Sequence, residues 1–275
     1  MEKKLRRSAR LVDMTQHLLE HPYRLIPLTT FAEEYGSAKS SISEDLSIIK
    51  ELFEHKGVGM LKTVAGAAGG VRYIPLLKKQ AAVEIVEEIC TKLEQSDRLL
   101  PGGYLYMSDI LGEPETLNRI GRIMATLFAE RDIDYVMTVE TKGIPLAHAT
   151  ANYLNVPVVI VRRDTKVTEG SVVSINYVSG SSKRIQTMSL ARRVLPEQSK
   201  VLIIDDFMKA GGTARGMIDL LKEFKAEVVG IGVLVETSDV EERLVDDYIS
   251  LGKITQLDLK DKEIKLELGN FLSKF

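Results

Sequence analysis

The sequence predicts an α/β protein in which a parallel sheet, covered by helices on both faces, follows a smaller N-terminal domain. Two observations carry this prediction. Up to about residue 75 the apolar residues keep helical spacing and are followed by a hairpin pattern. Farther on, short apolar segments at 133–139, 156–161 and 201–204, the last without alternation, are separated by helical segments. Such runs are typical of strands buried on both faces of a parallel sheet. We therefore expect domains at 1–75 and 76–275.

The N-terminal domain is expected to contain three helices and a hairpin. Apolar residues with helical spacing from residue 11 onward end at Pro22, which ends the first helix. Thr30 and Ser41 are each followed three residues later by glutamate, and this capping-box spacing predicts that the second and third helices begin there. The segments 60–64 and 71–74 predict the two strands of the hairpin.

The larger domain begins with one further helix at 76–93, which is either a linker or a dimer helix. Pro114 is suited to the first turn of a helix and predicts the next one. The strands named above then alternate with helices, one of them at 145–154. After a last clear strand at 230–235, we expect the tail to continue as alternating helix and strand to residue 275.

Composition narrows the class of protein. The 275 residues are 44% hydrophobic and 28% charged, with a formal net charge of -2, which is ordinary for a soluble protein. No apolar run approaches the roughly 20 residues of a membrane helix, and the basic N-terminus lacks a signal peptide's apolar core. We expect a cytoplasmic protein with no membrane partner. A single cysteine, Cys90, and four scattered histidines predict neither a disulfide nor a structural metal, and nothing indicates a redox cofactor.

The segment 201–213 is the most informative part of the chain. Its apolar run leads to two adjacent carboxylates, Asp205 and Asp206, and then to a glycine-rich turn that begins a helix. Glycines such as Gly211 let backbone N–H groups approach an anion closely, Thr213 adds a hydroxyl, and the helix N-terminus favours a phosphate. Carboxylates accept hydrogen bonds from the vicinal hydroxyls of a ribose. The pattern therefore predicts a sugar-phosphate site in an exposed turn.

A second loop should lie beside the first. Thr141-Lys142-Gly143 follows the strand 133–139, so this tripeptide lies at the same carboxyl edge of the sheet as Asp205. Ligands of open parallel sheets bind at that edge. Between these loops, residues 162–190 are rich in serine, threonine and glycine and contain few apolar runs, as in functional or disordered loops.

An apolar run, an acid pair, a glycine-rich loop and a helix in this order resemble the signature of type I phosphoribosyltransferases. The resemblance implies that phosphoribosyl pyrophosphate (PRPP) binds together with Mg2+, and that residues 162–190 form a hairpin that closes over it. One departure is Lys209-Ala210, where many members have Ala-Thr, and the lysine adds a cation near the phosphates. The implied contacts of the ribose and its 5-phosphate are Asp205, Asp206, Lys209, Ala210, Gly211, Gly212 and Thr213. Those of the diphosphate are Thr141, Lys142 and Gly143.

The N-terminal domain resembles a winged helix-turn-helix, because a short turn precedes its third helix and a hairpin follows. In that family the third helix enters the major groove of double-stranded DNA while the hairpin wing lies beside it. The expected DNA contacts of the turn and third helix are Ser37, Lys39, Ser40, Ser41 and Ser43. The expected contacts with the DNA backbone are Arg6, Arg7 and Lys62. The alternative is a small interaction domain whose serines only cap helices, and four acids on the third helix, among them Glu44 and Asp45, favour this alternative.

The two domains in this order resemble the purine operon repressor family of Gram-positive bacteria. The resemblance rests on 37–46, Pro101-Gly102-Gly103-Tyr104, 141–145 and 205–213. It implies a homodimeric repressor of purine biosynthesis genes whose operator binding is weakened by PRPP. Purine nucleotides that carry phosphates would compete for the same pocket.

One position speaks against catalysis. Hypoxanthine- and xanthine-type transferases usually have a lysine near the end of the strand after the PRPP helix, where it meets the base, and this chain has Glu236-Thr237. An acid does not replace a cationic donor, although it would suit an amino-bearing base. Tyr104 and Phe207 are either contacts for a nucleotide ring or core residues. We expect an effector sensor without catalytic residues, and two alternatives stay open: an active purine phosphoribosyltransferase with a DNA-binding extension, and a nucleotide-binding interaction protein.

Overall fold

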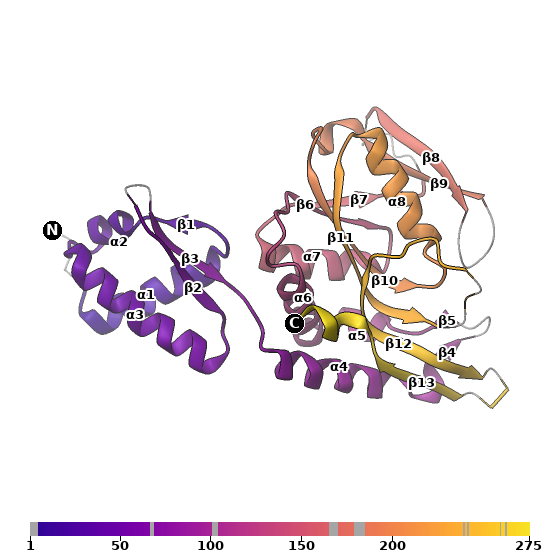
Figure 1. Cartoon of the computed structure of the whole chain (residues 1–275), viewed down its shortest axis with the longest axis horizontal. Coiled ribbons are helices and arrows are strands. Elements are labelled where there is room, and N and C mark those ends of the chain that lie inside the picture. Colours follow the sequence, from indigo (N-terminus) through magenta and orange to yellow (C-terminus); the bar gives the residue numbers. More distant parts are fainter. Residues whose placement is uncertain are drawn as a thin grey trace. The chain divides into compact units, whose positions relative to one another are not determined.

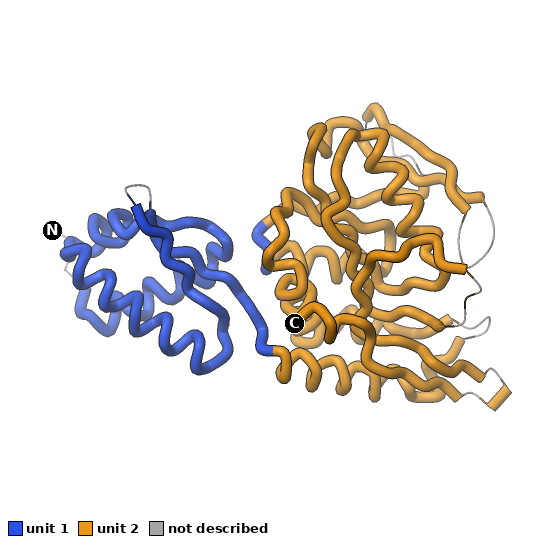
Figure 2. Tube along the Cα trace, viewed as in Figure 1, with its two compact units in different colours: residues 1–78, 153–155 blue, residues 79–152, 156–275 orange. Residues whose placement is uncertain are grey.

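The computed structural model describes residues 5–66, 69–100, 104–164, 170–178, 185–238, 240, 242–258, 260–261 and 263–275. Two compact units make up the chain, the first of residues 1–78 and 153–155, the second of 79–152 and 156–275 (Figure 2). No helix in the described part is long and apolar enough to cross a membrane.

The first unit consists of three helices and a small antiparallel sheet. The helices are α1 (Arg7–Glu20), α2 (Leu28–Glu34) and α3 (Lys39–Lys56), and the strands are β1 (Leu25–Ile26), β2 (Met60–Val64) and β3 (Gly70–Ile74). The strand order is β1-β3-β2, so the β2–β3 hairpin gains a third, short strand. Met14, Phe31 and Ile42 are fully buried in a core shared by the three helices, and Tyr73 joins it from β3.

The capping-box predictions are wrong. Helix α2 begins at Leu28 and α3 at Lys39, and the residues before them, Pro27 and Ala38, make no side-chain cap. Thr30 and Ser41 therefore lie inside their helices. The physical reason for α2 is packing, because Leu28 lies against the core of the unit and this contact outweighs a local hydrogen bond.

The second unit contains a six-stranded sheet in the order β13-β12-β11-β10-β6-β7 (Figure 1). Its strands are β6 (Tyr135–Val139), β7 (Val158–Val161), β10 (Lys200–Met208), β11 (Glu227–Thr237), β12 (Ile249–Asp258) and β13 (Glu263–Leu268). All neighbours are parallel except β12 and β13. The tail therefore ends in two strands and a short 3-10 helix, η4 (Asn270–Lys274), and its expected alternation of helix and strand is wrong.

Helices cover both faces of this sheet, which confirms the predicted α/β architecture. They are α4 (Lys79–Leu93), α5 (Ser108–Gly112), α6 (Pro114–Leu127), α7 (Gly143–Leu154) and α8 (Gly212–Glu223). On one face Met217 and Leu220 of α8 share a core with Val201 and Ile203 of β10. On the other face the ring of Phe128, the residue that ends α6, lies over the glycines of β11.

Smaller elements complete the second unit. A hairpin of β8 (Val172–Val178) and β9 (Ile185–Ala191) packs on α8 through Tyr177 and Met188. The short strands β4 (Leu99–Leu100) and β5 (Tyr104–Leu105) pair with each other, and the 3-10 turns are η1 (Ser96–Arg98) and η3 (Arg192–Val194). The predicted segment Pro101-Gly102-Gly103 lies outside the described residues.

Candidate functional site

The glycine-rich loop lies between β10 and α8, as the sequence predicts. Gly211 has φ 85°, in the left-handed region where glycine is favoured, and is the N-cap of α8. No side chain caps this helix end. The first N–H groups of α8 are therefore left for another acceptor, which is the arrangement that binds phosphates.

The acid pair lies within the strand rather than in the exposed turn that the sequence suggested. Strand β10 continues to Met208 because its pairing with β11 continues, with Asp205 opposite Val233 and Phe207 opposite Val235. Asp205 is consequently only 7% exposed. Its carboxylate Oδ1 accepts a hydrogen bond from the N–H of Asp206 at 3.0 Å.

Burial raises the pKa of both acids. It raises the pKa of Asp205 well above its ordinary value, and the adjacent charge of Asp206 raises it further. Burial also raises the pKa of Asp206, against the opposing charges of Lys142 and Arg163. Within the described residues Asp205 has no ion pair to offset its burial. A ligand that donates hydrogen bonds to this carboxylate would stabilise its charged form, as an ion pair would.

The second predicted loop lies directly against the acid pair. A Cβ atom at Gly143 would come within 2.3 Å of Thr138 Oγ1 and 2.9 Å of Asp205 Oδ1, so only glycine allows this approach. Gly143 begins α7, two residues earlier than expected, and the peptide bond between Glu140 and Thr141 is cis. The loop and the acid pair, 62 residues apart in sequence, therefore form one site.

Several observations show that the residues present fit a phosphorylated sugar. The hydroxyl of Thr138 is buried with no hydrogen-bond partner in the described structure, at the point where Gly143 meets Asp205. Two helices, α7 and α8, begin at this edge of the sheet, and their N-termini favour anions. Thr141 and Lys142 are exposed beside them.

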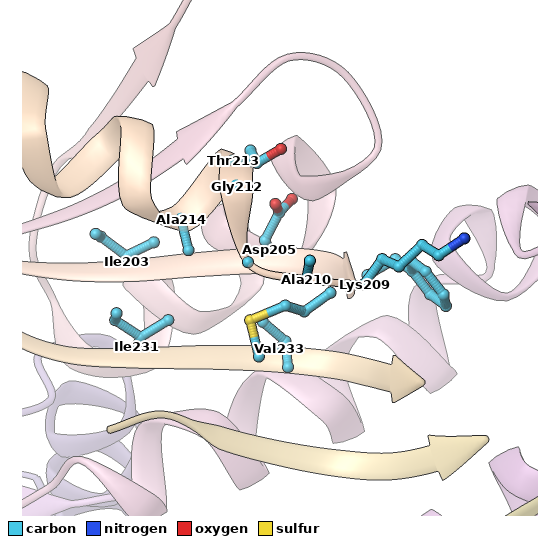
Figure 3. A pocket seen from close by; sticks show the side chains of 12 residues that line it. Ile203, Asp205, Lys209, Ala210, Gly212, Thr213, Ala214, Ile231 and Val233 are labelled. Atoms are coloured by element: carbon cyan, nitrogen blue, oxygen red, sulfur yellow. The ribbon is translucent and has the colours of Figure 1, made fainter. Parts of the chain in front are cut away.

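A cavity of about 70 Å³ lies at the glycine-rich loop. It has room for a few water molecules, far less than a whole phosphorylated ribose, so a ligand would extend across the open edge of the sheet. Figure 3 shows the side chains of Thr213 and Asp205 pointing to the same side, whereas the amine of Lys209 points away from them. The lining residues are Ile203, Asp205, Phe207, Met208, Lys209, Ala210, Gly211, Gly212, Thr213, Ala214, Ile231 and Val233.

Two residues at this site, Tyr177 and Arg163, were missed from the sequence. Tyr177 of β8 donates a hydrogen bond to Gln186 Oε1 at 2.7 Å. Burial raises the pKa of Tyr177, while Arg163 and a hydrogen bond with Thr213 act in the other direction. The hairpin thus reaches the glycine-rich loop, but its tip at 179–184 lies outside the described residues. The only sequence signal was the alternation of polar and apolar residues in β8.

The two aromatic candidates differ in exposure. Tyr104 is 59% exposed, so its alternative role as a core residue is wrong. Phe207 is half-buried and lines the cavity.

Glu236, at the end of β11, is engaged within the protein. Its carboxylate accepts hydrogen bonds from the hydroxyls of Tyr248 at 2.5 Å and Ser250 at 2.7 Å. The guanidinium of Arg243 lies 2.6 Å from the same carboxylate. Both oxygens of Glu236 therefore have partners within the protein.

The first unit presents only part of the predicted DNA-binding set to solvent. Arg6, Lys39, Ser40, Ser43 and Lys62 are exposed, and Ser41 is half-buried.

Two members of that set are engaged inside the unit. Arg7 Nε lies 2.8 Å from Asp45 Oδ1, although its side chain stays 55% exposed. The hydroxyl of Ser37 accepts a hydrogen bond from Arg10 at 3.1 Å and donates one to the carbonyl of Tyr35 at 3.2 Å. Ser37 thus fixes the turn before α3.

One acid that weighed against DNA binding does not face outward. Asp45 is fully buried and is bonded by Arg10 at 2.6 Å as well as by Arg7. A cationic neighbour of Lys62 was missed, because Arg72 lies directly opposite it on β3. The pairing register of a hairpin is not visible in the residue types alone.

Comparison with known proteins matches each of the two units to a known domain family. The family model of the bacterial purine repressor N-terminal domain matches residues 6–75, and that of the phosphoribosyl transferase domain matches residues 107–266. The chain is 63% identical over 272 residues to the purine biosynthesis transcriptional repressor PurR of Bacillus subtilis (strain 168), over 99% of this chain and 95% of the relative. It is 46% identical over 269 residues to the purine biosynthesis transcriptional activator PurR of Lactococcus lactis subsp. lactis (strain IL1403), over 98% and 99% of the two chains.

A solved structure shares the fold of the second unit. The adenine phosphoribosyltransferase of Thermoanaerobacter pseudethanolicus superposes with a TM-score of 0.54 and 21% identity, over 61% of this chain and 99% of that chain. A DNA-binding unit followed by a phosphoribosyltransferase fold defines a transcription regulator built on an enzyme scaffold. The chain belongs to the PurR family of purine biosynthesis transcriptional regulators.

Proposed function

We propose that this protein represses purine biosynthesis genes by binding their operator DNA and is released from DNA by PRPP. Residues 1–75 bind DNA and residues 76–275 bind the effector, in the cytoplasm. The observation that carries the effector is the contact of Gly143 with Asp205, which joins a diphosphate loop to a ribose-phosphate loop. Repression, rather than activation, is supported by the higher identity to the repressor of Bacillus subtilis.

In this proposal Asp205 and Asp206 accept hydrogen bonds from the ribose hydroxyls. The N–H groups of Ala210 to Thr213 hold the 5-phosphate, and the loop 141–143 holds the diphosphate. Mg2+ would neutralise part of the diphosphate charge. Purine nucleotides compete because they carry the same ribose and phosphate groups.

Release follows from linkage between the two sites. If one state of the homodimer binds PRPP better and another binds operator DNA better, each ligand weakens the other by the same coupling free energy. A purine base is not required for this, and Glu236 supports sensing over catalysis because both oxygens of its carboxylate bond to groups of the protein. An active transferase remains the second candidate, supported by the shared fold.

The test is a gel shift with DNA from a purine gene promoter, titrated with PRPP and Mg2+. We expect PRPP to release the wild-type protein, and the double variant Asp205→Asn/Asp206→Asn to stay bound. The matched control is Asp219→Asn, which changes an aspartate of α8 whose side chain is 41% exposed and pairs with Arg215 and Lys222. If the double variant is released like the control, the proposed site is wrong. Pyrophosphate release on adding a purine base to the protein with PRPP would instead support the enzyme.

A further inference from the structure

A segment that follows β11 holds the back of the glycine-rich loop. Arg243 Nη1 donates a hydrogen bond to the carbonyl of Lys209 at 3.1 Å, and the N–H of Leu244 donates one to the carbonyl of Ala210 at 2.9 Å. A Cβ atom at Gly211 would lie 3.4 Å from Val245 Cγ2, so this side chain packs on the next residue of the loop. Three consecutive loop residues are thus held by 243–245.

Arg243 is itself fixed by its surroundings. Its Nη2 donates to the carbonyl of Thr237 at 2.6 Å and lies 2.6 Å from Glu236 Oε2. Its guanidinium carbon lies 5.4 Å from the centroid of the Tyr248 ring. The side chain of Glu236 is 5% exposed and that of Arg243 is 22% exposed, so this ion pair is largely shielded from water. A planar guanidinium with these partners has little freedom to turn.

The orientation of the loop carbonyls determines where the loop N–H groups point. In a trans peptide unit the carbonyl and the N–H point in opposite directions. Drawing the carbonyls of Lys209 and Ala210 toward 243–244 therefore turns the N–H groups of Ala210 and Gly211 the opposite way. Donors that are held in place before an anion arrives bind it more tightly, because no ordering cost remains.

We propose that Arg243 is a positioning residue for the phosphate loop, oriented by Glu236. This inference rests on the proposed function, since it assumes that the loop binds the 5-phosphate of PRPP. It also gives Glu236 a role: the acid at the end of β11 serves the phosphate loop through Arg243 instead of contacting a base.

The experiment compares Arg243→Gln, Arg243→Lys and Glu236→Gln by calorimetry, with Arg119→Gln as the matched control. Arg119 also pairs with a carboxylate, that of Glu88 on α4 at 2.7 Å, but does not bond the loop. The probes are ribose 5-phosphate and pyrophosphate, each with Mg2+. We expect Arg243→Gln to weaken ribose 5-phosphate binding about 10-fold or more, because a charge-assisted bond to the loop is lost. Pyrophosphate affinity should change less than about twofold, Arg243→Lys should be intermediate, and Arg119→Gln should resemble the wild type.

Hydrogen exchange of the ligand-free protein gives a readout that does not depend on PRPP. We expect the amides of 209–213 to exchange faster in Arg243→Gln than in Arg119→Gln, by more than any difference in melting temperature between the two variants accounts for. Unchanged exchange together with unchanged ribose 5-phosphate affinity would overturn the inference. An equal loss of affinity for ribose 5-phosphate and for pyrophosphate, together with a lower melting temperature, would also overturn it, since that pattern means general destabilisation. If the wild type binds neither ribose 5-phosphate nor PRPP, the proposed function fails, and exchange alone then decides whether Arg243 positions the loop.

Discussion

Two buried aspartates, one in each unit, have neighbours of opposite charge: one lies beside arginines and the other beside a second acid. Asp45 of α3 is fully buried and is bonded by Arg7 and Arg10. Asp205 of β10 is nearly as buried, at 7% exposed, but its close neighbour is a second acid, Asp206. A buried charge is costly unless it is paired, so the two sites must differ in purpose.

The difference supports the proposal that the site of Asp205 binds a ligand, whereas Asp45 is structural. Asp45 ties α1 to α3 and is satisfied without any other molecule. Asp205 lies where two loops meet, and its pKa is raised by burial and by Asp206, so its surroundings in the protein disfavour its charge. In the proposed function, the hydroxyls of a ribose would supply further hydrogen-bond donors to this acid.

Removing the charge of Asp45 should have the largest effect on stability. In Asp45→Asn the guanidinium of Arg10, whose side chain is 9% exposed, loses its charged partner. We expect the free energy of unfolding of the first unit to fall by about 3 kcal/mol, as for other broken buried pairs. Urea unfolding of the full chain, followed by hydrogen exchange in α1 and α3, measures this change.

Glu44→Gln is the matched control for this prediction. Glu44 also lies near Arg7, but at 3.8 Å and with its side chain 71% exposed. Exposed pairs of this kind contribute about 0.5 kcal/mol or less. Equal losses in the two variants would show that the burial of Asp45 is not what makes its pair important.

The next largest effect is expected where the two loops of the second unit meet. In Gly143→Ala the new methyl group would overlap Thr138 Oγ1 and approach Asp205. We expect a loss of about 1–3 kcal/mol in stability, as for other overpacked positions, and weaker PRPP binding because the loops separate. Thermal unfolding and calorimetry with PRPP measure the two effects.

Gly112→Ala serves as the control for this substitution. A Cβ atom at Gly112 meets nothing within 4 Å, so stability and PRPP affinity should stay as in the wild type. Normal PRPP binding by Gly143→Ala would contradict the proposed meeting of the loops.

Removing the charge of Asp205 should change the stability with the opposite sign. Asp205→Asn keeps the size of the side chain but removes a charge that burial disfavours. We expect stability without ligand to rise by about 1 kcal/mol, the usual size of a single-residue effect, while PRPP affinity falls. A fall in melting temperature at neutral pH would show that Asp205 is a structural acid like Asp45.

The fold was predictable because its signals are local. The run from Val201 to Ile204, the glycines after it and the next helix are contiguous in sequence, and each has its own preferred conformation. The order of these signals was enough to predict the parallel sheet and the position of the glycine-rich loop.

What the sequence missed depends on pairing between distant segments. The burial of Asp205 follows from β10 continuing beside β11 to Met208. The engagement of Glu236 requires Arg243 and Tyr248, which reach it across a connection without a regular pattern. Leu28 begins α2 through packing rather than through a cap. None of these contacts is visible from residue types and spacing alone.

The contrast between the aspartates also predicts the pH dependence of binding. The pKa values of Asp205 and Asp206 are raised in the folded protein. In the pH window between the ordinary carboxylate pKa of about 3.9 and these raised values, the folded state therefore holds more protons than the unfolded state. These two acids therefore lower stability as the pH rises through that window. A ribose that donates to the carboxylates favours their charged form, so PRPP binding should release protons and strengthen with pH in the same window.

Calorimetry of PRPP binding near pH 5, in buffers with different ionisation enthalpies, measures this release. PRPP carries titrating phosphates of its own, so the comparison is between the wild type and Asp205→Asn/Asp206→Asn. We expect the wild type to release more protons per bound PRPP than any residual binding by the double variant does. Equal release would mean that the acid pair is already charged before PRPP binds, and that its burial is compensated within the protein as fully as that of Asp45.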